Sequence, residues 1–144
     1  MNALTRKLAT VGSALAMAGS SLLLASSPAS AATSCYASSC AGLDPSTTIC
    51  QNDARTVADT DYPGVELRYS PTCRAAWARY SRGMGFSMNV EIQRWDGSNG
   101  TTIYSTYYSG NGSTVWTRMI NDAGLLARAC GHESASRYGC SAAY

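Results

Sequence analysis

Hydrophobic and polar residues alternate most clearly between residues 65 and 80, and this stretch predicts a β-hairpin. The apolar face of its first strand consists of Val65, Leu67 and Tyr69. Alternation of this kind is typical of a strand with one face in a core. Pro71 ends the strand, because its ring fixes φ and it has no backbone N–H to donate to a sheet. One face of the second strand carries Cys73, Ala75 and Trp77, which suits a small core fixed by a disulfide.

The same alternation of apolar and polar residues, with a period of two, recurs along the rest of the chain. The further strands that it predicts are residues 56–58, 88–95, 101–109, 114–120 and 125–130. Glycine- and asparagine-rich turns separate them. A short helical turn is expected at residues 44–50, with Asp44 as N-cap and Pro45 at the first helical position. About seven strands with frequent turns predict an all-β fold, a small antiparallel sandwich or barrel stapled by disulfides.

Residues 1–31 have the pattern of a signal peptide. Arg6 and Lys7 are followed by apolar and small residues up to position 24, and Ala29 and Ala31 give a small-x-small cleavage site. The apolar stretch is too short and too rich in alanine, glycine and serine for a good membrane anchor. We therefore expect a secreted, extracellular protein whose single domain spans residues 32–144, with no membrane contact after cleavage.

The net charge of the domain that remains after cleavage limits the partners that it can bind. Arg6 and Lys7 would leave with the signal peptide. Nine arginines would then balance the nine acidic residues, all of which come later in the chain, so the domain would carry no net charge. A neutral domain argues against nucleic-acid binding, which depends on a basic surface. The remaining partners are an extracellular protein or a cell-wall glycan, bound by a monomer.

Six cysteines follow the signal peptide: Cys35, Cys40, Cys50, Cys73, Cys130 and Cys140. An even number in an exported domain predicts three disulfides, but the sequence does not choose among the possible pairings. Cys130 and Cys140 could close the small, polar tail as a loop. A zinc site is disfavoured, because there is no Cys-x-x-Cys and only one histidine. We expect no metal and no cofactor.

Two kinds of catalytic site are possible in principle. His132 is the only histidine and would have to act as the base of any serine or cysteine nucleophile, with Glu133 and Ser134 beside it. Alternatively, Glu66 and Glu91 could lie on one exposed sheet face and act as acid and base on a glycan. Both glutamates are equally placed to pair with arginines on neighbouring strands, so no catalytic residue is assigned.

Aromatic residues are more promising as a binding surface. They gather in the second half of the chain as Trp95, Tyr104, Tyr107, Tyr108 and Trp116. Neighbours in a strand point to opposite faces, so Tyr107 and Tyr108 cannot both face a core. Exposed tyrosine and tryptophan beside arginine are typical of protein interfaces and sugar-stacking surfaces, although edge-strand tyrosines can also simply cover a sheet.

Several segments together resemble a family of secreted proteins. They are Cys35-Tyr36 with Ser39-Cys40, Gly42 and Asp44-Pro45; Cys50 with Asp53-Ala54; residues 65–70 with Cys73 and residues 75–79; and residues 117–120 and 127–130. In these segments the chain is similar to the YjfA-like secreted domain of unknown function of Gram-positive bacteria. The resemblance implies an exported small protein and supplies no catalytic residues. Cys140 and the tail after His132 depart from it.

We therefore expect a secreted, disulfide-stabilised binding protein without catalytic activity. The alternatives are a secreted antagonist, either a toxin or an inhibitor of an extracellular hydrolase, and a small wall-directed glycan hydrolase that uses Glu66 and Glu91.

Overall fold

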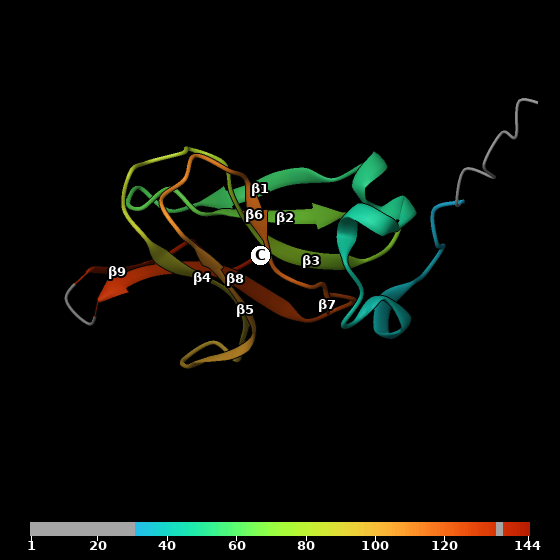
Figure 1. Cartoon of the computed structure of the whole chain (residues 1–144). Helices are drawn as coiled ribbons and strands as arrows, with labels where there is room; N and C mark the ends of the chain where they lie inside the picture. The colour runs from blue at the N-terminus through green and yellow to red at the C-terminus, as the bar shows by residue number, and fades with distance from the viewer. Residues whose placement is uncertain (1–30, 135–136) are drawn as a thin grey trace, which may run out of the picture. The chain divides into compact units, whose positions relative to one another are not determined.

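A computed structural model describes residues 31–134 and 137–144, and its strands form two antiparallel sheets (Figure 1). The expected signal peptide lies outside these residues, apart from Ala31. The predicted all-β fold with short helical turns near the N-terminus is confirmed. In the part of the chain that the structure describes, no helix has the length and apolarity needed to cross a membrane.

The predicted hairpin is the centre of the first sheet. This sheet contains β1 (Arg55–Asp59), β2 (Glu66–Ser70), β3 (Ala75–Tyr80), β6 (Val115–Trp116) and β7 (Ile120–Asn121). The order is β1-β2-β3-β6, and β7 also pairs with β3. The expected strand at 114–120 is therefore interrupted. Its middle turns to other partners: Met119 N–H donates to the Leu43 carbonyl at 3.0 Å, and Gly42 N–H donates to the Met119 carbonyl at 2.9 Å.

The second sheet has the order β5-β4-β8-β9. Its strands are β4 (Met88–Trp95), β5 (Gly100–Tyr108), β8 (Leu126–Ser134) and β9 (Arg137–Cys140). The first three were expected, although β8 runs further than residue 130. The fourth was missed, because the tail that contains it lacks an apolar alternation. Cys130 lies opposite Cys140 in the β8–β9 pair.

Two separate cores hold the layers together. The larger lies between the sheets and includes Leu67 and Tyr80 from the first sheet and Val90 and Ile92 from the second. The smaller lies on the other face of β3 and contains Cys73, Ala75 and Trp77. The small core that was expected around Cys73, Ala75 and Trp77 is therefore confirmed, with Cys50–Cys73 as its disulfide. Pairing of Leu67 with Ala78 and of Arg68 with Trp77 sends the two apolar sets of the hairpin to opposite faces.

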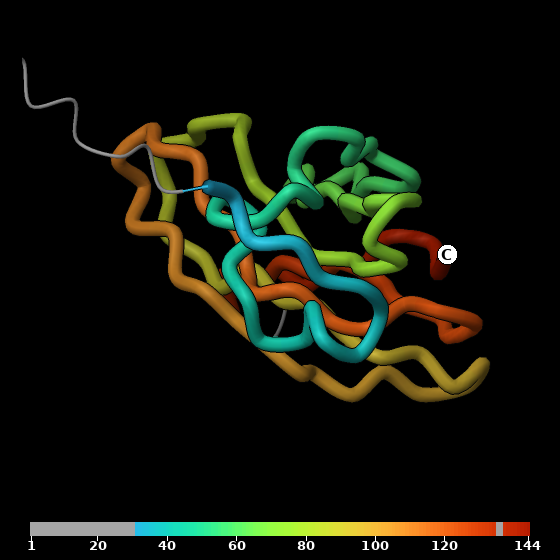
Figure 2. The backbone as a smooth tube through the Cα atoms, turned by 90° about the vertical axis from the view of Figure 1, so that its right-hand side faces the viewer, coloured from blue at the N-terminus to red at the C-terminus, as the bar shows by residue number. Residues whose placement is uncertain are grey.

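Three single-turn 3₁₀ helices cover the smaller core. They are η1 (Ala37–Cys40), η2 (Pro45–Thr47) and η3 (Ile49–Asn52), and Figure 2 shows this N-terminal segment, in blue to teal, towards the viewer. As expected, Asp44 caps η2: its side chain accepts from Ser46 N–H at 2.9 Å, and Pro45 follows it. We call the segment that contains η1, η2 and η3 the N-terminal cap. Single-turn helices have little stability of their own, so the N-terminal cap is held in place by packing on Trp77 and by disulfides.

All six cysteines form disulfides, as predicted. The pairs are Cys35–Cys40, Cys50–Cys73 and Cys130–Cys140. The third confirms the expected closure of the tail. Cys50–Cys73 joins η3 to the start of β3, so it fixes the N-terminal cap on the first sheet.

Candidate binding site beside Trp116

Two pockets open on either side of Trp116, where the N-terminal cap meets the first sheet. The first has a volume of about 230 Å³ and includes Gln51, Arg68, Trp77 and Arg79 in its lining. The second has a volume of about 280 Å³ and includes Asp44, Tyr104 and Arg118. Trp116 lines both. We call these eight residues the Trp116 groove.

The indole of Trp116 is fixed but remains accessible. Its Nε1–H donates to Asp44 Oδ1 at 2.9 Å, and the residue keeps 36% of its surface exposed. Burial acts to raise the pKa of Asp44, but hydrogen bonds from Ser46 and Trp116 and the charge of Arg118 hold it below its usual value. The N-cap of η2 therefore stays charged and also orients the exposed indole.

The first pocket has an aromatic floor and two guanidinium groups. Trp77 is 4% exposed and belongs to the smaller core. Arg68 donates from Nη1 to Thr56 Oγ1 at 2.9 Å and from Nη2 to the Ala54 carbonyl at 2.7 Å. Arg79 Nε donates to Glu66 Oε2 at 2.6 Å. These contacts hold both arginines in place against the indole floor.

The positive charges and hydrogen-bond donors of Arg68 and Arg79 are only partly matched by acceptors in the protein. Arg68 Nε is buried and has no hydrogen-bond partner among the described residues. The pKa of Arg68 is lowered, first by burial and then by the positive charge of Arg79, while Glu66 acts in the opposite direction. An anionic group in this pocket would relieve that repulsion and could accept hydrogen bonds from the guanidinium groups.

The second pocket is shaped by a close approach between Gly42 and Tyr104. Gly42 has φ of +82°, and a Cβ built there would lie 3.2 Å from the Tyr104 hydroxyl oxygen. Arg118 Nη1 donates to the Gly42 carbonyl at 2.7 Å. Glycine therefore suits this position both by backbone conformation and by space.

The predicted aromatic surface divides into three parts. Tyr104 and Trp116 come together in the Trp116 groove. Trp95 lies on the second sheet beneath Arg128, whose guanidinium carbon is 4.1 Å from the ring centroid, and Tyr107 is 61% exposed beside Asn89. Tyr108 is fully buried, and its hydroxyl donates to the Met84 carbonyl at 2.6 Å. Tyr108 therefore leaves the exposed set, in keeping with the expectation that it and Tyr107 face opposite ways.

The sequence interpretation missed Arg68, Arg79 and Trp77 as parts of this surface. A signal was present, because Arg68 and Glu66 occupy the polar face of the predicted hairpin. What the alternation does not reveal is that Trp77 lies on that same face, opposite Arg68.

The proposed carboxylate pair does not exist. Glu66 lies on β2 of the first sheet and Glu91 on β4 of the second, both on the faces that point away from the shared core. The two carboxylates are therefore separated by both sheets and cannot flank one glycosidic bond. Glu66 pairs with Arg79 instead.

Glu91 has an unexpected partner in His132. His132 Nε2 lies 2.9 Å from Glu91 Oε1, and the hydroxyl of Thr102 donates to Glu91 Oε2 at 2.8 Å. Burial acts to raise the pKa of Glu91, but hydrogen bonds from Thr102, Gln93 and His132 keep it below its usual value. Glu133, the sequence neighbour of His132, accepts a hydrogen bond from the Tyr62 hydroxyl at 2.9 Å. Glu91 is thus held as a charged acceptor on the outer face of the second sheet.

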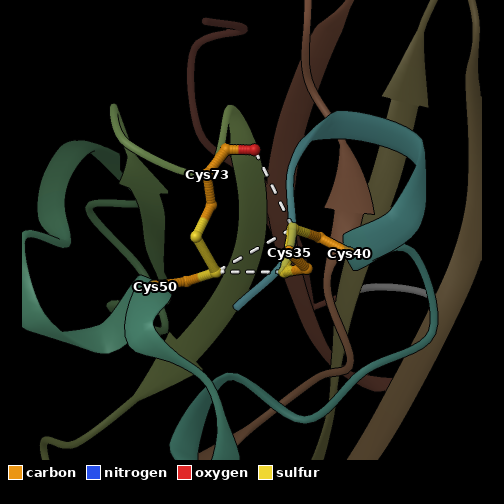
Figure 3. Close-up of side chains that lie close together, drawn as sticks. All are labelled: Cys35, Cys40, Cys50 and Cys73. Carbon is orange, nitrogen blue, oxygen red and sulfur yellow. Dashed lines mark hydrogen bonds between the residues drawn. A yellow bond between two sulfur atoms is a disulfide. The ribbon is translucent and has the colours of Figure 1, made fainter. Parts of the chain in front are cut away.

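Four cysteines form a tight sulfur cluster. The sulfurs of Cys35, Cys40, Cys50 and Cys73 all lie within 4.8 Å of one another (Figure 3). Within the described residues, no other group of three or more histidine, cysteine or acidic side chains is arranged to hold a metal ion. The cluster has the donor number of a structural zinc site, but its sulfurs are bonded in two disulfides, and a disulfide does not provide thiolate ligands.

Comparisons with curated proteins and with solved structures gave no match. A family model described as protein of unknown function (DUF2690) matches residues 38–130. The matched segment contains the whole Trp116 groove and ends before Cys140. The finer likeness to YjfA-like proteins stays a prediction. The chain belongs to the DUF2690 family of proteins of unknown function.

Proposed function

We propose that this protein is an exported, non-catalytic binding domain and that the Trp116 groove binds an acidic cell-wall glycan. The observation that carries the proposal is the exposed Trp116 indole next to a pocket that holds two arginines and a tryptophan floor. Aromatic rings offer flat apolar surfaces for sugar rings, and arginine binds carboxylate or phosphate groups through directed hydrogen bonds. The two neighbouring positive charges of Arg68 and Arg79, which both line this pocket, support an acidic ligand rather than a neutral one.

Export is a part of the same proposal. The signal-peptide pattern of residues 1–31 and three disulfides support it, because disulfides persist in oxidising compartments. The YjfA-like resemblance extends this to a Gram-positive bacterial wall, where acidic glycans are exposed to secreted proteins.

Cosedimentation tests the proposal directly. The purified oxidised protein is mixed with increasing amounts of insoluble cell wall, and the bound fraction is measured after centrifugation. A second wall sample has its carboxyl groups converted to amides. We expect saturable binding to native wall and much weaker binding to the amidated wall, because the arginines lose their charged partner.

Substitutions place the binding on the groove. Trp116→Ala should weaken binding by about tenfold or more, as expected for a central aromatic contact. Trp95→Ala is the matched control: it removes a half-buried indole from the other sheet and should leave binding unchanged. Equal loss in both variants, or no pelleting of the wild type, would overturn the glycan proposal and direct the search to soluble protein partners, as for a secreted antagonist.

A further inference from the structure

Two disulfides of the N-terminal cap are in contact with each other. Cys35 Sγ lies 3.4 Å from Cys50 Sγ, and Cys40 Sγ lies 3.9 Å from the same atom (Figure 3). The bond partner of Cys50 is Cys73. Cys50 Sγ therefore has three sulfur neighbours, although only one of them is its covalent partner.

Solvent reaches the sulfur cluster only at Cys35. Cys35 is partly exposed, whereas Cys40, Cys50 and Cys73 have no exposed surface. Cys35 is therefore the member of the cluster that a thiol from solution meets first. The Cys50–Cys73 bond lies beneath it, between η3 and the beginning of β3.

We propose that these four cysteines form one thiol–disulfide exchange site, with Cys35 as the entry point for an external thiol or dithiol. The external thiolate attacks Cys35 Sγ, forms a mixed disulfide and breaks Cys35–Cys40, which releases Cys40 as a thiolate. Cys40 then attacks Cys50 Sγ, forms Cys40–Cys50 and breaks Cys50–Cys73, which releases Cys73. A second external thiol attacks the mixed disulfide and frees Cys35.

The sum of these steps balances. Two external thiols become one disulfide, and the protein gains two electrons and two protons as the thiols of Cys35 and Cys73. The number of sulfur–sulfur bonds stays at two throughout, because every step exchanges one such bond for another; the last step moves one of them from the protein into the external disulfide. The reductant is any small or protein thiol that reaches Cys35.

Proximity makes the internal step favourable. Exchange requires a thiolate to reach a disulfide sulfur, and Cys40 already lies beside Cys50 in the folded protein. Held in this way, the reaction avoids the entropy cost of bringing two partners together. Cys130–Cys140 lies in the second sheet and outside this sulfur cluster, so it serves as an internal reference.

The first experiment uses single substitutions. In the Cys35→Ala variant, Cys40 loses its covalent partner and becomes a free thiol. The purified variant is alkylated under native conditions and its peptides are mapped by mass spectrometry. We expect the label on Cys73 as well as on Cys40, together with a Cys40–Cys50 peptide. In the matched control Cys140→Ala, the label should stay on Cys130.

The second experiment measures rates in the otherwise native protein. A small monothiol is added, samples are quenched by acid, and the opening of each disulfide is followed by alkylation. The rate for Cys50–Cys73 is divided by the rate for Cys130–Cys140, which corrects for any general loosening. We expect this ratio to fall by about tenfold in the Cys35→Ala, Cys40→Ala double variant, because the internal nucleophile is gone.

Either experiment can overturn the proposal. Label confined to Cys40 in the first variant would mean that the two disulfides do not exchange. An unchanged or higher rate ratio in the double variant would mean that external thiols open Cys50–Cys73 without the relay.

Discussion

Trp77 is the residue on which the smaller core depends. It is 4% exposed and packs with Met119 and the buried cysteines of the cap. We expect Trp77→Ala to lower the free energy of unfolding by about 3–5 kcal/mol, as for other large-to-small changes in a core. Denaturant unfolding followed by circular dichroism measures this. Trp95→Ala should cost clearly less, since Trp95 is only half-buried; equal costs would show that the cap is not a packed layer.

Asp122 gives the protein an unusual pH dependence. Burial raises its pKa from 3.8 to about 6, against the opposing charges of Arg94 and Arg74. The folded state therefore binds a proton more tightly than the unfolded state, and the stability that this provides is lost as pH rises from about 4 to about 6. Asp122→Asn should remove this loss, which is on the order of 3 kcal/mol, as measured by unfolding at pH values below and above this range.

An exposed acidic residue supplies the contrast. Backbone hydrogen bonds from Asn99 and Ser98 lower the pKa of Asp96. Its contribution to stability is therefore present above its usual pKa and lost as pH falls, the opposite direction to that of Asp122.

Parallel profiles of unfolding free energy against pH for wild type and Asp122→Asn would contradict the prediction for Asp122.

Single residues show where sequence-based prediction ends. The capping role of Asp44 was predictable, because Asp44, Pro45 and Ser46 are adjacent and the cap is local. Its bond to Trp116 was not, since 72 positions separate the two residues and only the fold brings them together. The aromatic list included Tyr104 and Trp116, which line one pocket, but alternation alone did not say which tyrosine of the 107–108 pair is buried.

The β8–β9 hairpin is closed by a disulfide of its own. β9 is an edge strand of four residues, and Cys130–Cys140 closes a loop of ten residues across the pair. We expect the Cys130→Ala, Cys140→Ala double variant to lose about 2–3 kcal/mol of stability, mainly through the larger freedom of its unfolded chain. Hydrogen exchange should show faster opening of β9 than in wild type. The same protection in both proteins would mean that the strand is held by pairing alone.

Element prediction succeeded where the pattern was local. The hairpin of β2 and β3 follows from alternation and the break at Pro71, and the pair of β4 and β5 follows from alternation and a glycine turn. The segment 114–120 alternates as well, yet it is divided into β6 and β7, because Met119 exchanges hydrogen bonds with Gly42 and Leu43 in the N-terminal cap. Such an interruption depends on a tertiary partner and leaves no mark in the strand itself.

The layered arrangement explains why the Trp116 groove lies where it does. The N-terminal cap covers one face of the first sheet, and the second sheet covers the other. The groove forms at the border of the cap, so its residues come from the N-cap position of η2, from η3, β2, β3, β5 and β6, and from the segment that follows β6. Because Cys50–Cys73 ties the cap to β3, exchange at the sulfur cluster would loosen the wall of the groove that carries Gln51.

The proposed export and the oxidised state of the cysteines concern the whole molecule, and one mass measurement tests both. A domain of this size buries a limited core, and disulfides of this kind form outside the reducing cytosol. We expect the protein recovered from the medium of producing cells to begin at Ala32 and to lack six hydrogens relative to its reduced form, one pair for each disulfide. Intact-mass spectrometry before and after reduction gives both values. Recovery of the full 144-residue chain from the cytosol with free thiols would contradict export and would remove the cell wall as its site of action.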